Sequence, residues 1–102
     1  MFEQLEEQQK AVQEKLAAQT IEVGSGDGLV VVRMTGNKVV RSVIIDRDHA
    51  DYADHDAVED HLVMAMNEAI RKATEMEQQV VQEWMASVLP GGMGALGGLF
   101  GR

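Results

Sequence analysis

Histidine and aspartate side chains crowd into residues 46–61, where they have the chemistry needed to hold a metal ion. The histidines recur every six residues with carboxylates between them: His49, His55 and His61, with Asp46, Asp48, Asp51, Asp54, Asp56 and Asp60. Histidine with carboxylate suits Zn²⁺, and carboxylates alone suit harder cations. The spacing matches no calcium-binding loop, however, and metal-binding histidine pairs on a helix are four residues apart. We therefore expect solvated charge and helix capping here, with no metal and no cofactor.

Two other patterns associated with chemistry are weaker. The glycine run of residues 24–28 resembles a phosphate-binding loop, but such a loop leads into a helix, and a Val-rich segment typical of a strand follows this one. The chain has no cysteine, and no serine occupies a nucleophile-elbow pattern. The serines are Ser25, Ser42 and Ser87. A catalytic carboxylate pair needs a walled cleft to shift one pKa, so we expect neither an enzyme nor a small-molecule substrate.

The nine basic side chains are the remaining candidates, because cations can neutralise the phosphates of nucleic acid. Arg71 and Lys72 are adjacent on one predicted helix, and Lys10 and Lys15 lie on another. In a two-fold dimer each cation becomes a pair, and paired patches can straddle a duplex by phosphate contacts alone. The formal net charge of −8 argues against this interpretation, and ordinary surface charge is the alternative.

The apolar periodicity and the turn signals predict an α+β subunit with the element order helix, three strands, helix. The expected elements are a helix over residues 2–19, strands over 20–23, 29–35 and 38–46, and a long helix over 58–88. Short turns between the strands favour an antiparallel meander. Asp56 followed by Glu59 has the form of a capping box for the second helix. Residues 1–90 then make one domain.

Gly36 and Asn37 predict a two-residue hairpin in which Thr35 pairs with Lys38. That register places a nearly apolar set on the face toward the helices: Val30, Val32, Met34, Val39, Arg41, Val43 and Ile45. The opposite face carries a mixed set: Leu29, Val31, Arg33, Thr35, Lys38, Val40, Ser42 and Ile44. Since a solvent-facing sheet surface is normally more polar, we interpret this second face as buried between subunits; a partly wet, β-branched surface is the alternative.

The long helix carries an apolar stripe with alternating steps of four and three residues: Leu62, Met66, Ala69, Ala73, Met76 and Val80. An average step of about 3.5 residues is typical of a coiled-coil seam. The helix is roughly 45 Å long at 1.5 Å per residue, and the rest of the chain is too small to cover such a rod. We therefore expect an obligate homodimer. Its candidate interface combines this stripe with apolar residues of the outer sheet face: Val31, Val40 and Ile44.

Glycine supplies six of the eleven residues from 91 to 101, interspersed with Met93, Leu96, Leu99 and Phe100. Glycine at this density does not sustain a helix, so we expect residues 91–102 to form a flexible tail; docking of its apolar residues on a partner is the alternative. No apolar run is long enough to span a membrane, and no secretory signal opens the sequence. Together with the absence of cysteine, this predicts a cytoplasmic protein without a membrane partner.

The order of these elements, and the residues within them, resemble the YbaB/EbfC family of bacterial nucleoid-associated proteins. The similar segments cover most of the chain: Val12–Leu16, Ile21–Gly24, Gly26, Gly28–Val30, Val32, Gly36, Ser42–Asp46, Val58–Val63, Ala65, Asn67–Ala69 and Lys72. Residues 42–46 match the family's V-x-I-D strand end, and residues 58–72 resemble its second-helix signature. The Gly/Met/Leu/Phe segment after Pro90 is also similar to the family's C-terminus.

This resemblance implies a homodimer with projecting, tweezer-like helices that binds double-stranded DNA in the nucleoid with little sequence preference. The phosphate contacts that it suggests are first those on the helices, Lys10, Lys15, Arg71 and Lys72, and then those on the sheet, Arg33, Lys38 and Arg41. The sequence departs from the family in two places. Glu3, Glu6 and Glu7 make the first helix acidic where many relatives carry Met and Lys, and Val31 and Ile44 stand where relatives are often polar. An acidic protein-interaction module that binds no DNA is therefore the alternative function.

Overall fold

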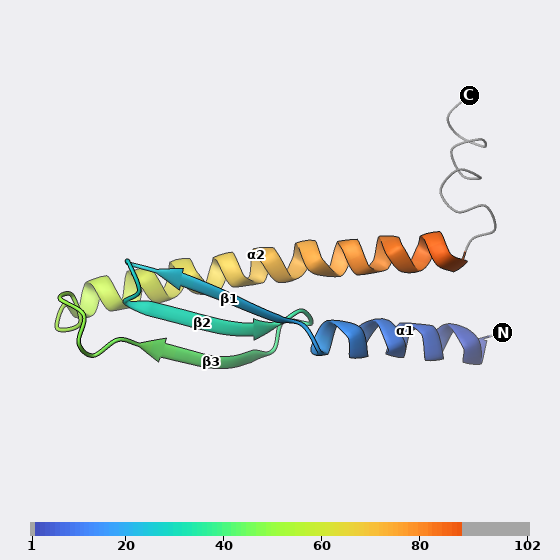
Figure 1. Cartoon of the computed structure of the whole chain (residues 1–102), viewed down its shortest axis with the longest axis horizontal. Coiled ribbons are helices and arrows are strands. Elements are labelled where there is room, and N and C mark those ends of the chain that lie inside the picture. The colour runs from blue at the N-terminus through green and yellow to red at the C-terminus, as the bar shows by residue number, and fades with distance from the viewer. Residues whose placement is uncertain (1, 89–102) are drawn as a thin grey trace, which may run out of the picture.

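A long helix forms one layer of the molecule, and a three-stranded sheet with a shorter helix beyond its end forms the other (Figure 1). The computed structural model describes residues 2–88, so the predicted tail, 91–102, lies outside the described residues. The elements are α1 (Phe2–Ala17), β1 (Thr20–Ser25), β2 (Val30–Thr35), β3 (Val40–Ile45) and α2 (His55–Val88). The predicted α+β fold and element order are confirmed, with boundaries that differ by at most three residues.

The sheet has the order β1-β2-β3, and both neighbouring pairs are antiparallel. The hairpin between β2 and β3 differs from the prediction, because the Thr35 amide donates to the Val39 carbonyl at 2.8 Å. The loop therefore holds the three residues 36–38, and Lys38 adopts the left-handed conformation with a φ of 66°. A three-residue loop that ends in a left-handed residue is a common alternative to the two-residue turn. The predicted pairing of Thr35 with Lys38 is thus wrong by one residue.

A β-bulge follows the hairpin and compensates for this shift. Met34 lies opposite Val40, and the next pair along is Arg33 with Ser42. Arg41 is therefore an extra residue on β3. Loop and bulge together move the register by two residues, which restores the alternation of faces. The pairs beyond the bulge share the inner face as predicted: Val43 with Val32, and Ile45 with Val30. Val40 itself was assigned to the wrong face, since its partner Met34 belongs to the core.

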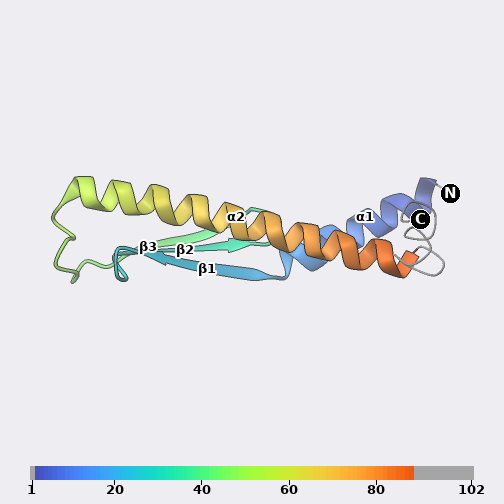
Figure 2. The ribbon, with the colours of Figure 1, turned by 90° about the horizontal axis from the view of Figure 1, so that it is seen from above.

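α2 crosses the inner face of the sheet, and three alanines let it lie close to β1 and β2 (Figure 2). Ala65, Ala69 and Ala73 are completely buried and follow one another at steps of four residues. The buried strand residues in the same cluster are larger: Ile21, Val23, Val30, Val32 and Met34. Small side chains on the helix and branched or long side chains on the sheet thus form the core.

The apolar stripe of α2 is largely used within the subunit. Ala69 and Ala73 have no exposed surface, and Val80 is also buried. The other members of the stripe pack against the same core: Leu62, Met66 and Met76. We expected a partner helix to cover this stripe, but the sheet of the same chain covers it. The assignment of Ala69 and Ala73 to the dimer interface is therefore wrong. Leu29 and Thr35, assigned to the outer face, are buried as well.

α2 begins at His55, three residues before the predicted start. Asp54 caps it, because its Oδ1 accepts from the Ala57 amide at 3.1 Å while its carbonyl accepts from the Val58 amide at 3.0 Å. The prediction that Asp56 caps this helix is therefore wrong. Although α2 has 34 residues, no helix in the described part of the chain is apolar enough over a sufficient length to cross a bilayer.

β3 is the edge strand that α2 leaves uncovered. Val40 and Val43 belong to the inner face yet are 44% and 41% exposed, and Ile44 is 44% exposed on the other face. Val39, just before the strand, is also exposed. Within the described sheet, the far edge of β3 pairs with no strand. We refer to the four exposed residues on this edge, Val39, Val40, Val43 and Ile44, as the β3 surface.

α1 lies beyond the sheet, beside the C-terminal half of α2 (Figures 1 and 2). Leu16 anchors its end, because the side chain is completely buried and the carbonyl accepts from the Gly36 amide at 3.0 Å. The preceding residue, Lys15, forms an ion pair with Glu83 of α2. We call α1 together with residues 77–88 of α2 the arm.

Candidate nucleic-acid interface

Four of the seven candidate cations contact glutamate side chains. The pairs are Lys15 with Glu83 (Nζ–Oε2 3.5 Å), Arg33 with Glu22 (Nε–Oε2 3.0 Å), Lys38 with Glu77 (Nζ–Oε2 4.0 Å), and Arg71 with both Glu68 and Glu75. All of these side chains are substantially exposed, and exposed pairs stabilise a protein by only about 0–1 kcal/mol. The two lysine pairs are long, so a phosphate can readily replace the glutamate.

Arg71 is held more firmly than the lysines. Its Nε donates to Glu68 Oε2 at 3.0 Å, and its two terminal nitrogens donate to Glu68 and Glu75, one turn away on either side. The hydrogen bond from Arg71 lowers the pKa of Glu68, and the same bond and charge raise the pKa of Arg71. One cation between two carboxylates leaves a local net charge that is negative, so Arg71 is a poor phosphate ligand.

Lys10, Arg41 and Lys72 form no ion pair with any residue between 2 and 88. Lys10 is on α1, beside the groove between the two helices of the arm. Arg41 is the bulge residue of β3, and Lys72 lies on α2, close enough to Glu68 for its charge to lower that pKa further. Among the seven candidates, these three side chains carry the charges most available to an external anion.

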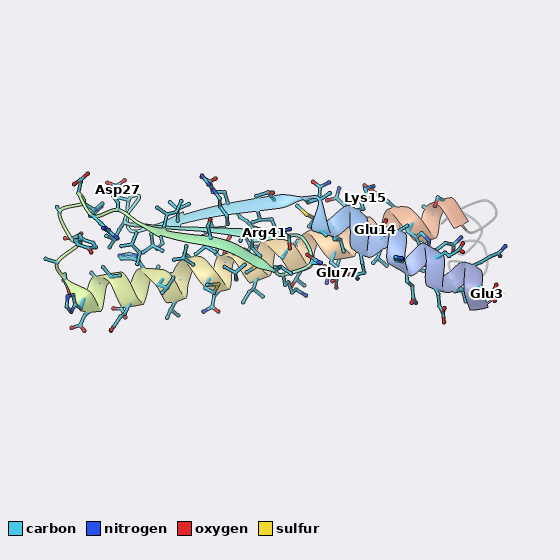
Figure 3. All side chains as sticks on the ribbon, turned by 90° about the horizontal axis from the view of Figure 1, so that it is seen from below. Glu3, Glu14, Lys15, Asp27, Arg41 and Glu77 are labelled. Carbon is cyan, nitrogen blue, oxygen red and sulfur yellow. The ribbon has the colours of Figure 1, made fainter. Side chains whose placement is uncertain are left out.

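The candidate cations do not form one continuous strip. Lys15, Lys38 and Arg41 gather where the sheet gives way to α1; Figure 3 shows Lys15 and Arg41 there with the acidic Glu14 and Glu77, which alternate with them. Lys10 lies farther out on the arm. The remaining cations lie on other surfaces: Arg33 beside β1, with Arg71 and Lys72 in the middle of α2.

Three side chains in the histidine- and aspartate-rich residues 46–61 accept local backbone hydrogen bonds. Asp46 Oδ1 accepts from the Asp48 amide at 2.9 Å, His49 Nδ1 accepts from the Asp51 amide at 3.0 Å, and Asp54 caps α2. Nowhere in residues 2–88 do three histidine, aspartate or glutamate side chains converge as a metal site would require. These contacts hold the β3–α2 loop in place.

One polar contact was not foreseen. Ser25 Oγ lies 2.7 Å from His61 Nδ1, although 36 residues separate them in the sequence. Hydroxyl and imidazole together are the beginning of a nucleophile–base pair, but a third group that orients the imidazole is needed for catalysis. No carboxylate among the described residues bonds to His61, and the pair instead joins the end of β1 to α2. No local sequence signal marks such a contact.

The fold and the exposed charges define a class of small helix–sheet subunits that present charged helices and an uncovered strand edge at their surface. The same fold occurs in the uncharacterized protein HP0035 from Helicobacter pylori. Its crystal structure matches with a TM-score of 0.70 at 20% identity, over 78% of this chain and 84% of that one.

The chain belongs to the YbaB/EbfC DNA-binding family, whose family model matches residues 1–92. A nucleoid-associated protein of Chloroflexus aggregans is 39% identical over 82 residues, which cover 80% of this chain and 82% of the relative. A nucleoid-associated protein of Bradyrhizobium diazoefficiens is 41% identical over 99 residues, covering 97% of this chain and 89% of the relative. The predicted family membership is confirmed. The family is described by DNA binding and not by a catalytic activity.

Proposed function

We propose that this protein is a nucleoid-associated protein that binds double-stranded DNA as a homodimer, through phosphate contacts and with little sequence preference. The family match over residues 1–92 is the observation that carries this proposal. The named relatives are nucleoid-associated, which also supports a location in the cytoplasm on the nucleoid. No catalysis, metal or cofactor is part of the mechanism.

The β3 surface supports the homodimer. The far edge of β3 pairs with no strand in residues 2–88 and carries four exposed apolar residues, which makes it a template for a second chain. Soluble proteins normally blunt such edges with charge. A second copy that pairs along β3 would bury this surface on both subunits by the same two-fold contact. Of the original interface candidates, Val40 and Ile44 therefore remain central, with Val31 next to Ile44 in the sheet.

The distribution of free cations supports phosphate contact without base readout. Lys10, Arg41 and Lys72 are unpaired within the described residues, and Lys15 and Lys38 can exchange a weakly held glutamate for phosphate. A dimer doubles each of these charges. Lysines on long flexible stems are suited to phosphates and carry no sequence information by themselves. Arg33 and Arg71 are the weaker members of the original set, because each is held by a close glutamate.

Binding to labelled duplexes of unrelated sequence, followed by fluorescence anisotropy over a range of salt, tests the proposal. We expect similar affinities for all the duplexes and a log–log salt slope of about −0.9 per phosphate contacted. At about 50 mM salt the electrostatic attraction between cations and phosphates is strong, so an absence of binding there would exclude DNA as the partner.

An acidic protein-interaction module is the second candidate. The net charge of −8 and the glutamates that occupy four of the seven candidate cations favour it. In that case the β3 surface would bind another protein. Pull-down of a stoichiometric protein partner without nucleic acid, together with absent duplex binding, would select this function.

A further inference from the structure

The two helices of the arm leave an open groove between them, beyond the end of the sheet. Its volume is about 540 Å³, which is within the range of clefts that hold organic ligands. The apolar part of its lining comes from both helices: Val12 of α1, with Val81 and Trp84 of α2. Glu6, Gln9 and Lys10 line it as well and give it a polar rim. A groove with this lining fits an apolar chain segment that also offers backbone hydrogen-bonding groups.

Trp84 supplies a second observation. Its indole Nε1 is shielded from water, yet it has no hydrogen-bond acceptor among the described residues. A buried N–H group without an acceptor is costly, and tryptophan at a protein surface normally finds one. A rotation of the indole would let Nε1 donate to an acceptor in the groove, either a polar side chain of the lining or a segment bound there.

The chain itself provides a suitable segment next to this groove. α2 ends at Val88, and Trp84 and Val81 precede that end by roughly 6 and 10 Å along the helix axis. The fourteen residues that follow, 89–102, span up to about 46 Å when extended, which is ample to turn back at Pro90-Gly91-Gly92. Met93, Leu96 and Leu99 recur at every third residue. A polyproline II helix has three residues per turn, so in that conformation these three side chains would share one side.

We propose that residues 89–102 dock in the arm groove of their own chain. Met93, Leu96 and Leu99 cover Val12, Val81 and the indole of Trp84, and a backbone carbonyl of the segment accepts the Trp84 Nε1–H after a small rotation of the ring. The docked segment bridges α1 and α2 and thereby holds the arm together. It also lies beside Lys10, which forms no ion pair with the residues that the structure describes. This interaction is independent of whether the protein binds DNA.

Trp84 is the only tryptophan, so its fluorescence reports the groove directly in the full chain. We would compare the unmodified protein with the double variant Leu96→Ser, Leu99→Ser, using the double variant Gly94→Ser, Gly98→Ser as the matched control. Docking predicts that the leucine variant shifts Trp84 emission to longer wavelength and makes it more accessible to acrylamide. The glycine variant should behave like the unmodified protein.

Amide hydrogen exchange provides the second measurement. In the leucine variant, amides of residues 6–13 should exchange about tenfold faster, while those of residues 30–34 stay protected and show that the fold is intact. Unchanged emission, quenching and exchange in the leucine variant would overturn the proposal.

A mixing experiment separates docking within one chain from docking between chains. Trp84→Phe protein with an intact segment is mixed with the leucine variant. The only tryptophan in the mixture is then Trp84 of the leucine variant. We expect no recovery of quenching protection in the mixture. Recovery would show that the segment reaches the groove of another copy, and would overturn the assignment to the same chain.

Discussion

Ser25 Oγ and His61 Nδ1 lie 2.7 Å apart, and their hydrogen bond holds the β1–β2 turn against the second turn of α2. The imidazole also packs on the backbone of the next residue. A Cβ on Gly26 would lie 2.8 Å from two ring carbons of His61, and the φ of Gly26 is +69°. This position therefore requires both the absence of a side chain and a left-handed backbone.

We expect Gly26→Ala to destabilise the fold more than Gly28→Ala. Gly28 is also left-handed, with a φ of +87°, but no atom lies within 4 Å of its would-be Cβ. Both substitutions incur roughly 1–2 kcal/mol for the left-handed alanine. Only the first adds overpacking against His61, about 1–3 kcal/mol more. Denaturant unfolding of the two variants measures the difference, which should shrink when both are made in a His61→Ala background. Equal costs in the native background would contradict the contact.

Gly36→Ala and Lys38→Gly should change stability in opposite directions, although both lie in the same loop. A Cβ on Gly36 would lie 2.8 Å from the Leu16 carbonyl oxygen and 2.9 Å from Met76 Sδ, and we expect a loss of about 1–3 kcal/mol. Lys38 has a φ of 66°, so replacing it with glycine removes about 1 kcal/mol of backbone strain. The substitution also removes the weak ion pair with Glu77, and this offsets only a small part of the gain. Thermal unfolding tests the two signs. A stabilising Gly36→Ala would show that the loop can move away from α1.

The sequence pattern was sufficient for the order and type of the elements, because periodicity and turn residues act locally. The register was not predictable in the same way. Two irregularities, the left-handed Lys38 and the bulge at Arg41, cancel in their effect on most of β3, so the faces of Val43 and Ile45 were right although the pairing was wrong. A lysine in a left-handed position carries no sequence signal, since only glycine and asparagine are favoured there.

Heptad-like spacing on α2 was a correct sign of burial but did not identify what covers the helix. Ala69 and Ala73 suit a close sheet as well as a partner helix, and the sheet is what they contact. Among the cations, the spacing of Arg71 from Glu68 and Glu75 makes those pairs foreseeable, since neighbours three and four residues apart meet on a helix. The contact of Lys15 with Glu83 joins residues 68 positions apart, and only the fold brings them together.

The pair of Arg71 and Glu68 predicts how acid affects α2. The pKa of Glu68 is lowered in the folded protein, so the stabilisation is present above the usual value of 4.5 and is lost as the pH falls through the folded-state pKa. Arg71→Gln should lower the melting temperature slightly near neutral pH and not at all in strong acid. Gln78→Asn, at an exposed site on the same helix, is the control for helix propensity. A difference that persists undiminished in acid would show that Arg71 acts through packing instead.

Val43→Glu should convert the proposed dimer into monomers without unfolding the subunit. Val43 is 41% exposed in the single subunit, so a carboxylate there is tolerated in the monomer but becomes an unpaired buried charge when a second copy covers β3. We expect the dissociation constant to rise about 100-fold or more, the equivalent of roughly 3 kcal/mol. Sedimentation velocity measures the change, and Gln78→Glu, on exposed α2, is the charge-matched control. A dimer that survives Val43→Glu would place the interface away from β3.

Lys10→Gln and Lys72→Gln should each weaken binding to duplexes of every sequence by a similar factor. Each removes a cation without an ion pair in the described structure, and each occurs twice in a dimer. The salt slope should therefore become shallower by about 1.8 per substitution, since each of the two phosphates that is no longer neutralised accounts for about 0.9. Fluorescence anisotropy on two unrelated duplexes measures both effects. Weakening confined to one duplex would indicate base readout instead.

Glu83→Gln is the stronger test, because it should increase DNA binding. The substitution removes the carboxylate that holds Lys15 at 3.5 Å, and in a dimer it also removes two negative charges from the arms. We expect a higher affinity at low salt that converges with the unmodified protein as salt rises, since added salt screens the same charges. Arg71→Gln, which removes a cation already held by two glutamates, should change affinity least. If Arg71→Gln were the most damaging substitution and Glu83→Gln had no effect, the duplex would contact Arg71 in spite of its two glutamates, and Lys15 would not contribute to binding.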